Sequence, residues 1–368
     1  MFEYAGKAVL APMVRVGELP TRLLALKYGA DLVWSPEIVD KKIISCQRVE
    51  NEAIGCVDFV ETESTNANKV AFRTCPSLEK GRIVFQLGTA NPDLAVQAAT
   101  AVAKDVAAID VNAGCPMHFS IHSGMGAALL RTPDKLVDIL KALVSQVGQK
   151  FSIPISVKIR LLDDKDPKPT CDLVSRLIAT GIQHLTVHCR TIPMRPREPA
   201  LRFALKSIVD LCHEAGVTCY VNGDVNQGNE LDELRKIYGV DGVMLARAAE
   251  ANPSVFRPDG PLPWPIVAQE YAQLAKQYDN HHVNTKYCLS RMIPGKHEVY
   301  QSVARSKSTD AIIEALSGLT AEDAKVKNKR KNRTKSVSSD SAPHDKRQIE
   351  EAEQPLEIEV KRQKVQVA

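Results

Sequence analysis

Cys115 stands in a sequence setting that could present a reactive thiol. It follows an Asn-Ala-Gly triplet and precedes a proline, directly after the apolar, β-favouring run 107–112. Glycine permits backbone conformations that other residues avoid and proline fixes φ, so this loop would hold the thiol just beyond a strand's carboxyl end. An unperturbed cysteine is mostly protonated at neutral pH and could act as a general acid. The alternative is that Cys115 is one small buried hydrophobe among nine cysteines.

Chemically distinctive residues also occur where the other predicted strands end. They are Pro12 with Met13, Gln86, Asn112, Lys158 with Arg160, His188 with Arg190, Asn222 with Gly223 and Asp224, and Ala246 with Arg247. One polar residue on a buried strand is ordinarily a satisfied core group, but polar groups at the same height on several strands indicate a large polar ligand. The turns after the last two strands are typical of a barrel's phosphate site, where backbone N–H groups and Arg247 would bind phosphate.

Eight short runs rich in Val, Ile or Leu are predicted as strands, and helix-like segments separate most of them. The runs are 8–13, 30–36, 83–88, 107–112, 155–161, 184–190, 218–225 and 242–248. Such alternation indicates a parallel sheet, and eight units over roughly 250 residues fit a closed α/β barrel, the (β/α)8 TIM barrel. A doubly wound open sheet is the alternative, but no G-x-G-x-x-G follows the first strand. We expect the polar segment 38–75 to form an elaborated loop.

Composition limits the class of protein. The 368 residues are 44% hydrophobic, and no apolar run approaches the roughly 18 residues of a membrane span, which predicts a soluble globular protein. Nine cysteines without a C-x-x-C pair argue against a zinc or iron–sulfur site. Because the opening residues also lack a signal-peptide pattern, we expect a reducing compartment. The net charge of +4 divides into +3 for residues 321–368 and +1 for the rest, so a nucleic-acid surface on the body must be a local patch.

The chain is predicted to have three parts: a catalytic barrel over 1–258, a helical domain over 259–318 and a disordered basic and acidic tail over 319–368. Between Ile266 and Lys307 the helical part carries three acidic residues against six basic ones, namely Lys276, Lys286, Arg291, Lys296, Arg305 and Lys307. They form either a solvated face or a surface that binds an RNA backbone. The run from Lys325 to Lys335 holds seven basic groups and is either a nuclear-import signal or an RNA-binding tail, so we expect a nuclear or cytoplasmic protein.

Taken in order, these motifs resemble the tRNA dihydrouridine synthases, flavin enzymes that reduce uridine in tRNA. The resemblance covers about residues 6–310 and rests on LAPMVRVGELPTR (10–22), FQLGTANP (85–92), DVNAGCPM (110–117), GMGAALL (124–130), VKIR (157–160), TVHCRT (186–191), VNGDV (221–225) and GVMLARAAEANPSVF (242–256). The opening motif and the PMRPREP loop are most similar to the eukaryotic type 2 subfamily, which modifies position 20 of the D-loop. Cys189 departs from the usual glycine. Animal members append a double-stranded-RNA-binding domain that is absent here, so we expect the fungal form.

The resemblance implies a cofactor, a chemistry and a set of roles. FMN reduced by NADPH (or NADH) would pass hydride to C6 of uracil, and Cys115 would protonate C5. The implied cofactor contacts are Pro12, Met13, Gln86, Lys158, His188, Asn222, Gly223, Asp224, Ala246 and Arg247, and the implied uracil contacts are Asn112, Arg160 and Arg190. Lys158 would stabilise the anionic reduced flavin, and the base would leave its stack to reach it. We expect a monomer whose partner is tRNA, with neither a membrane nor a metal.

Two other functions remain open at this point. One is a flavin-dependent dehydrogenase of free pyrimidines or dihydroorotate, whose barrels also pair FMN with Cys or Ser. The basic helical domain separates the two, because a small-molecule enzyme has no use for it. The other is a non-catalytic tRNA-binding barrel, against which a bound flavin would argue.

Overall fold

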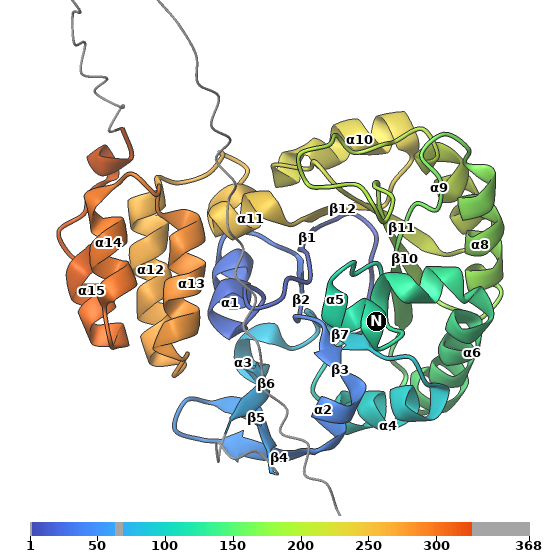
Figure 1. The fold of residues 1–368 in the computed structure, drawn as a ribbon, viewed down its shortest axis with the longest axis horizontal. Helices are drawn as coiled ribbons and strands as arrows, with labels where there is room; N and C mark the ends of the chain where they lie inside the picture. The colour runs from blue at the N-terminus through green and yellow to red at the C-terminus, as the bar shows by residue number, and fades with distance from the viewer. Residues whose placement is uncertain (1, 63–68, 326–368) are drawn as a thin grey trace, which may run out of the picture. The chain divides into compact units, whose positions relative to one another are not determined.

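Eight parallel strands close into a barrel in the computed structural model, which describes residues 2–62 and 69–325 (Figure 1). Every strand pairs in parallel with both neighbours, and the pairing of Lys7 with Gly242 closes the ring. The strands are β1 (Lys7–Leu10), β2 (Leu32–Trp34), β7 (Ile83–Gly88), β8 (Ala108–Ala113), β9 (Ile155–Arg160), β10 (His184–His188), β11 (Thr218–Asn222) and β12 (Gly242–Leu245). Each overlaps a predicted run, so the (β/α)8 prediction is confirmed.

Helices surround the barrel between its strands. They are α1 (Leu19–Lys27), α4 (Pro92–Val102), α6 (Pro133–Leu143), α8 (Lys168–Ile178), α9 (Leu205–Glu214) and α10 (Leu231–Tyr238), and the short α11 (Arg247–Ala251) follows the last strand. The start of α4 follows directly from its sequence. The Asn91 side chain accepts a hydrogen bond from the Leu94 N–H at 3.0 Å, while Pro92 occupies the first turn, where its missing N–H costs nothing.

Alternation along each strand decides which side chains enter the barrel. In β9, Ile155, Val157 and Ile159 are fully buried in the main hydrophobic core, which lies between the strands and the surrounding helices. Successive side chains of a strand point to opposite faces, so Lys158 and Arg160 point into the barrel. The polar residues noticed in the strand motifs are therefore interior residues, and the carboxyl end of each strand brings them to the barrel mouth.

Aromatic side chains fill the amino end of the barrel. The His184 ring stacks on Tyr4 with centroids 4.1 Å apart, and Tyr220 and Trp34 pack beside it. His184 is fully buried, and burial lowers its pKa to about 3, so the imidazole is neutral at physiological pH. This packing leaves the carboxyl end as the side of the barrel where chemistry can occur.

The segment after β2 contains a three-stranded antiparallel sheet, so the expectation of a loop was wrong. The elements are β3 (Ile38–Val39), α2 (Asp40–Ile44), β4 (Cys46–Asn51), β5 (Cys56–Glu61), β6 (Val70–Thr74) and α3 (Pro76–Glu79). Phe59 packs on Phe72, and Phe72 packs on Phe85 of β7. These few buried aromatic residues anchor the sheet to the barrel. The segment was predicted as a loop because most of its residues are polar.

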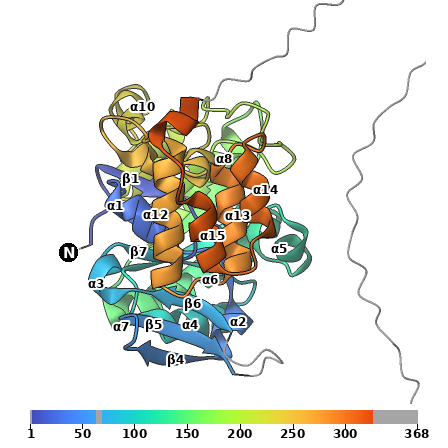
Figure 2. The same cartoon turned by 90° about the vertical axis from the view of Figure 1, so that its left-hand side faces the viewer.

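Four helices follow the barrel: α12 (Trp264–Gln277), α13 (His282–Met292), α14 (Glu298–Arg305) and α15 (Thr309–Leu316) (Figure 2). They share a hydrophobic core of their own, which Leu24 of α1 and Tyr28, the residue after α1, also enter. Barrel and helices together belong to one compact unit. Among the described residues, no helix is long and apolar enough to cross a membrane.

The predicted tail is described only at its beginning. Residues Ala321–Lys325 form a short 3-10 helix. The rest of the tail, with the basic run beyond Lys325, lies outside the described residues.

Candidate active site

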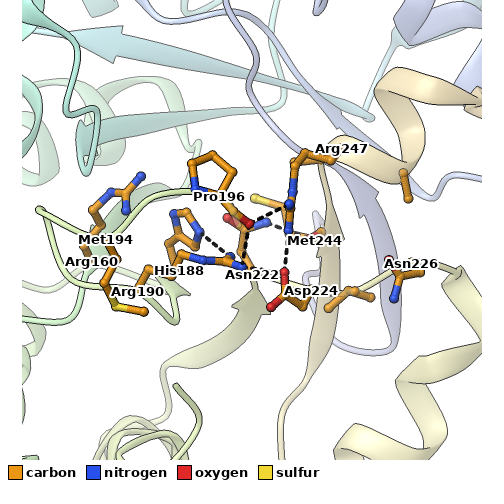
Figure 3. Close-up of a pocket in the computed structure, with 14 residues that line it drawn as sticks. Arg160, His188, Arg190, Met194, Pro196, Asn222, Asp224, Asn226, Met244 and Arg247 are labelled. Carbon is orange, nitrogen blue, oxygen red and sulfur yellow. Dashed lines mark hydrogen bonds and ion pairs between the residues drawn. The ribbon is translucent and has the colours of Figure 1, made fainter. Parts of the chain in front are cut away.

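A cavity of about 440 Å³ opens at the carboxyl ends of β9 to β12 (Figure 3). Eight of the predicted site residues line it: Arg160, His188, Arg190, Asn222, Gly223, Asp224, Ala246 and Arg247. Six other residues line the cavity and were not among the predicted site residues: Met194, Pro196, Val225, Asn226, Met244 and Ala248. The remaining predicted residues lie outside this lining: Pro12 and Met13 follow β1, Gln86 is in β7, Asn112 and Cys115 are in or after β8, and Lys158 is in β9.

Two arginines share one carboxylate on the cavity wall. An Nη of Arg190 lies 2.6 Å from Oδ1 of Asp224, and Arg247 pairs with the same oxygen. Partial burial alone would raise the pKa of Asp224. The hydrogen-bond donors around the carboxylate, with Arg190 the strongest, have the larger effect, so the pKa is lowered overall. Asp224 therefore orients the two guanidinium groups, which carry the charge that a phosphate would need. The sequence predicted that Arg190 contacts the uracil, and its guanidinium lies beside Asp224.

Backbone oxygens of the loop after β10 accept further hydrogen bonds from the two arginines. Arg247 donates to the Pro196 oxygen at 2.8 Å, and Nε of Arg190 donates to the Glu198 oxygen at 2.8 Å. This is the proline-rich loop of the PMRPREP motif, and Figure 3 shows Pro196 close to Arg247. The loop therefore fixes the positions of the Arg190 and Arg247 guanidinium groups.

The turn after β11 has the backbone that a phosphate loop requires. Gly223 has φ +112° and Asp224 has φ +51°, both in the left-handed region. A Cβ on Gly223 would lie 3.2 Å from the His188 ring and 3.4 Å from the Arg190 guanidinium. Glycine is needed there because it allows both the turn and the close approach of those side chains. Next to the turn, Asn222 donates to the Met244 backbone oxygen at 2.8 Å.

Three arginines and Lys158 surround His188. Burial lowers the pKa of His188 well below its usual value, and the charges of Lys158, Arg160, Arg190 and Arg247 lower it further. The imidazole is therefore neutral at physiological pH. A site with this many cations and few counter-charges is suited to an anionic ligand.

Of these basic side chains, Lys158 is the one whose positive charge the site stabilises least. Burial, followed by the charge of Arg160, lowers its pKa to about 7. No side-chain hydrogen bond joins its ammonium group to another described residue. Lys158 stands directly beside Asn112 in the strand register. An anionic group bound near them would restore the protonated form of Lys158.

A chain of three side chains links the barrel interior to the Cys115 loop. Asp110 is fully buried and accepts from the Gln86 amide at 2.8 Å, and the Gln86 oxygen accepts from the Asn112 amide at 3.0 Å. The Asn112 oxygen then accepts the backbone N–H groups of Gly114 and Cys115, each at 2.9 Å. Burial raises the pKa of Asp110 to about 6. Gln86 and Asn112 were predicted as cofactor and uracil contacts. Their hydrogen bonds also hold the Cys115 loop in place.

The Cys115 thiol is half-buried and held protonated. Burial, followed by the charge of Glu37, raises its pKa to about 11. Arg160 steadies the loop, because its Nε donates to the Gly114 backbone oxygen at 2.7 Å. Burial lowers the pKa of Arg160 to about 10, with a further contribution from the charge of Arg190, so it is still a cation at neutral pH. The arrangement can deliver a proton from sulfur at the barrel mouth.

Three functional candidates escaped the sequence reasoning: Glu37, Ser120 and Asp110. Glu37 lies beyond the carboxyl end of β2, so the pattern of polar residues at strand ends extends to this strand and indicates Glu37 as well. Ser120 lies in the short helix α5 (His118–His122), and nothing in the sequence distinguishes it from other serines. Asp110 stands inside the motif DVNAGCPM but was read only as part of a strand.

Among residues 2–62 and 69–325, no group of three or more His, Cys, Asp or Glu side chains could hold a metal ion.

Comparison with known proteins assigns the family. Residues 9–340 match the family described as "Dihydrouridine synthase (Dus)". The chain is 54% identical over 299 residues to the tRNA-dihydrouridine(20) synthase [NAD(P)+] of Schizosaccharomyces pombe, covering 80% of this chain and 61% of that protein. It is 51% identical over 323 residues to the protein of that name from Saccharomyces cerevisiae, covering 85% and 83%. A human tRNA-dihydrouridine(20a/20b) synthase [NAD(P)+]-like protein is 31% identical, with coverage of 84% and 89%. The match spans less than two thirds of the fission-yeast protein. The chain belongs to the dihydrouridine synthase family.

Proposed function

We propose that this chain reduces a uridine of the tRNA D-loop, at position 20, to 5,6-dihydrouridine, with FMN as cofactor and NADPH or NADH as reductant. The observation that carries the proposal is the Cys115 thiol, held protonated at a barrel mouth lined by three arginines and Lys158. The names of the two yeast relatives support the substrate position and the NAD(P)H reductant.

The residues at the mouth fit a phosphate-bearing flavin. Arg247 and the Gly223 turn would hold the phosphate, since guanidinium and backbone N–H groups are the donors that phosphates prefer. Lys158, half-buried and without a hydrogen bond to another described side chain, would face the anionic part of a reduced ring. Pro12 and Met13, both half-buried beyond β1, would pack against the ring.

The proton comes from this chain's own thiol. A reduced flavin, when bound, supplies hydride to a conjugated ring carbon such as C6 of uracil. Cys115 then donates its proton to C5, which completes addition of two hydrogens across the C5–C6 bond. The raised pKa keeps the thiol protonated until the ring becomes basic at C5. Arg160 holds the Cys115 loop through Gly114 and so fixes where the proton is delivered.

Asn112 can recognise uracil only as a donor. Its oxygen already accepts two backbone N–H groups, and one of its two amide hydrogens goes to Gln86. The remaining N–H would bind a carbonyl oxygen of uracil. Cytosine, which has an amino group at C4 in place of a carbonyl, would lose that hydrogen bond if this oxygen is O4. Arg160 would bind the other polar edge of the base.

The helical domain 259–318 would contact the tRNA backbone through its exposed cations. Lys296, Arg305 and Lys307 are exposed and form no ion pair within the described residues. The other three basic residues are engaged: Lys276 pairs with Asp310, Arg291 pairs with Glu250, and Lys286 donates to the backbone oxygens of Ala304 and Ser306. Phosphate contacts would thus come from fewer residues than the sequence charge indicates.

The test uses the full chain with FMN, NADPH and unmodified tRNA transcript, followed by mass mapping of dihydrouridine. We expect dihydrouridine at position 20, formed far more slowly when Cys115 is replaced by alanine. Free uridine, uracil and dihydroorotate are assayed in parallel. Faster turnover of a free pyrimidine or dihydroorotate would favour the small-molecule dehydrogenase, and a protein that fails to bind added FMN would remove the flavin mechanism.

A further inference from the structure

The Glu37 carboxyl lies against the Cys115 loop without full hydrogen bonding. Its Oε1 accepts from the Ser120 hydroxyl at 3.1 Å, and Ser120 is fully buried. Its Oε2 is buried and has no hydrogen-bond partner among the described residues. The Cys115 thiol is the neighbouring group that interacts with the carboxyl, and the two side chains influence each other's pKa. A buried carboxyl oxygen left without a partner is costly, so this arrangement calls for a functional reason.

Two glycines make room for this cluster. A Cβ on Gly88, at the end of β7, would lie 2.7 Å from Oε1 of Glu37. Gly126 has φ +58°, and a Cβ there would lie 2.3 Å from the Ser120 hydroxyl oxygen and 2.7 Å from the Cys115 backbone oxygen. A side chain at Gly88 would displace the Glu37 carboxyl, and one at Gly126 would displace the Ser120 hydroxyl and Cys115. The backbone is therefore shaped around the contact of Glu37, Ser120 and Cys115.

We propose that Glu37 is the proton relay that returns a proton to Cys115 after each turnover. The inference rests on the proposed function, in which Cys115 loses its proton to C5 of uracil. In that step the S–H bond breaks as the C5–H bond forms, and a thiolate remains. The Glu37 carboxylate, whose charge acts on the intact thiol, then takes a proton from the solvent, and that O–H bond breaks as the S–H bond forms again.

The direction of this transfer follows from the acidity of the two groups. Burial, followed by the charge of Glu37, holds the thiol pKa at about 11, so its thiolate is a strong base. Burial raises the pKa of Glu37, which favours the protonated carboxyl that can donate. A thiolate at Cys115 adds a second negative charge beside Glu37 and favours that form still more. Ser120 keeps the carboxyl in place during the exchange.

The charged groups that face the thiol come from two elements. Glu37 approaches from the loop after β2, and Lys158 and Arg160 approach from β9. The two cations favour the thiolate, whereas an ionised Glu37 disfavours it. Replacement of Glu37 by glutamine keeps the size of the side chain and removes both the negative charge and the transferable proton.

The first measurement needs neither tRNA nor NADPH. The rate of Cys115 alkylation by iodoacetamide is followed from pH 7 to 10 by peptide mass spectrometry in the purified protein. Glu37→Gln should lower the apparent thiol pKa and speed alkylation at pH 8 between about three- and ten-fold, because the thiolate is the reactive form. Glu61→Gln is the matched control. Glu61 raises the pKa of Cys46, so this variant should alter alkylation of Cys46 and leave Cys115 unchanged.

The second measurement is steady-state reduction of tRNA. Glu37→Gln should lower kcat by at least about ten-fold, the lower range for a lost proton-transfer group, with KM for tRNA and NADPH oxidation without tRNA unchanged. If the variant does not fold, Ser120→Ala, which removes only the hydroxyl that holds Glu37, should change both readouts in the same direction by a smaller amount. Retained flavin reports the fold of each variant.

The outcomes separate the relay from the proposed function. Alkylation of Cys115 that is the same in Glu37→Gln and wild type would overturn the relay, and so would an unchanged kcat. A wild-type enzyme that forms no dihydrouridine would overturn the proposed function and the relay with it. An active wild type with an equally active variant would overturn the relay alone.

Discussion

The side-chain oxygen of Asn112 lies 2.9 Å from the backbone nitrogen of Cys115 and accepts its N–H. The same oxygen accepts the Gly114 N–H, so one amide fixes the loop that carries the thiol. The orientation of that amide is set in turn by Gln86, and the orientation of Gln86 is set by the Asp110 carboxyl. A buried acid below the mouth therefore decides which polar atoms the mouth presents.

Asp110→Asn should change how stability depends on pH. Burial raises the pKa of Asp110 to about 6, above its usual value, so the folded state holds the proton more tightly than the unfolded chain does. Its contribution to stability is therefore complete below about pH 4 and is lost as the pH rises through about 6. The wild type should lose about 2–3 kcal/mol relative to Asp110→Asn over that interval. Urea unfolding of both proteins from pH 4 to 7 measures this, and parallel curves would contradict it.

Arg247→Ala should weaken retention of FMN. Arg247 is the more exposed of the two arginines paired with Asp224, and a lost charge-assisted hydrogen bond costs about 1.5–3 kcal/mol, or roughly 10- to 100-fold in Kd. Titration of the flavin-free protein with FMN, followed by flavin fluorescence, gives the Kd. Lys206→Ala, which breaks a surface pair with Asp210 on α9, is the control that should bind FMN normally.

Cys115→Ala should separate the two half-reactions. NADPH oxidation by the resting enzyme and FMN content should remain at wild-type levels, because the thiol is needed only when uracil is reduced. Reduction of tRNA should fall by roughly 10²- to 10⁴-fold, the usual effect of losing a general acid. Stopped-flow reduction of the flavin and mass mapping of the tRNA measure the two halves. Wild-type reduction of tRNA by this variant would make Cys115 a packing residue.

Charge reversal within residues 259–318 should distinguish basic side chains that bind tRNA from those that stabilise the fold. Lys296→Glu and Arg305→Glu change exposed side chains that form no ion pair within the described residues. Each should raise KM for tRNA and flatten its dependence on salt, because the slope falls by about one for each phosphate that the protein no longer neutralises. Steady-state kinetics at several salt concentrations measures both. An unchanged slope would mean that these residues form only a solvated face.

Lys286→Glu serves as the contrasting variant. Lys286 donates to the backbone oxygens of Ala304 and Ser306 at the carboxyl end of α14, so the sequence-based view of it as a phosphate contact does not fit its position. Its replacement should lower Tm, because carbonyl oxygens at a helix end lose their donor and meet a negative charge. Thermal unfolding measures the change.

Sequence alone determined the barrel and the position of the thiol. The eight strands could be predicted because each is a local run of apolar residues, and the strand-end rule then placed Cys115, Lys158 and His188 at one mouth. The antiparallel sheet over β4 to β6 was missed because its few buried aromatic residues pack against a strand elsewhere in the chain.

Only the tertiary structure decided how the site residues are paired. Glu37 meets Ser120 across 83 positions of sequence, and Arg190 meets Asp224 across 34. Such pairs depend on which strands become neighbours in the closed barrel and on loops that cross its mouth, and no local pattern carries that information. The residue types that do the chemistry were therefore readable in the chain, whereas the charges that set their pKa values became visible only when the barrel closed.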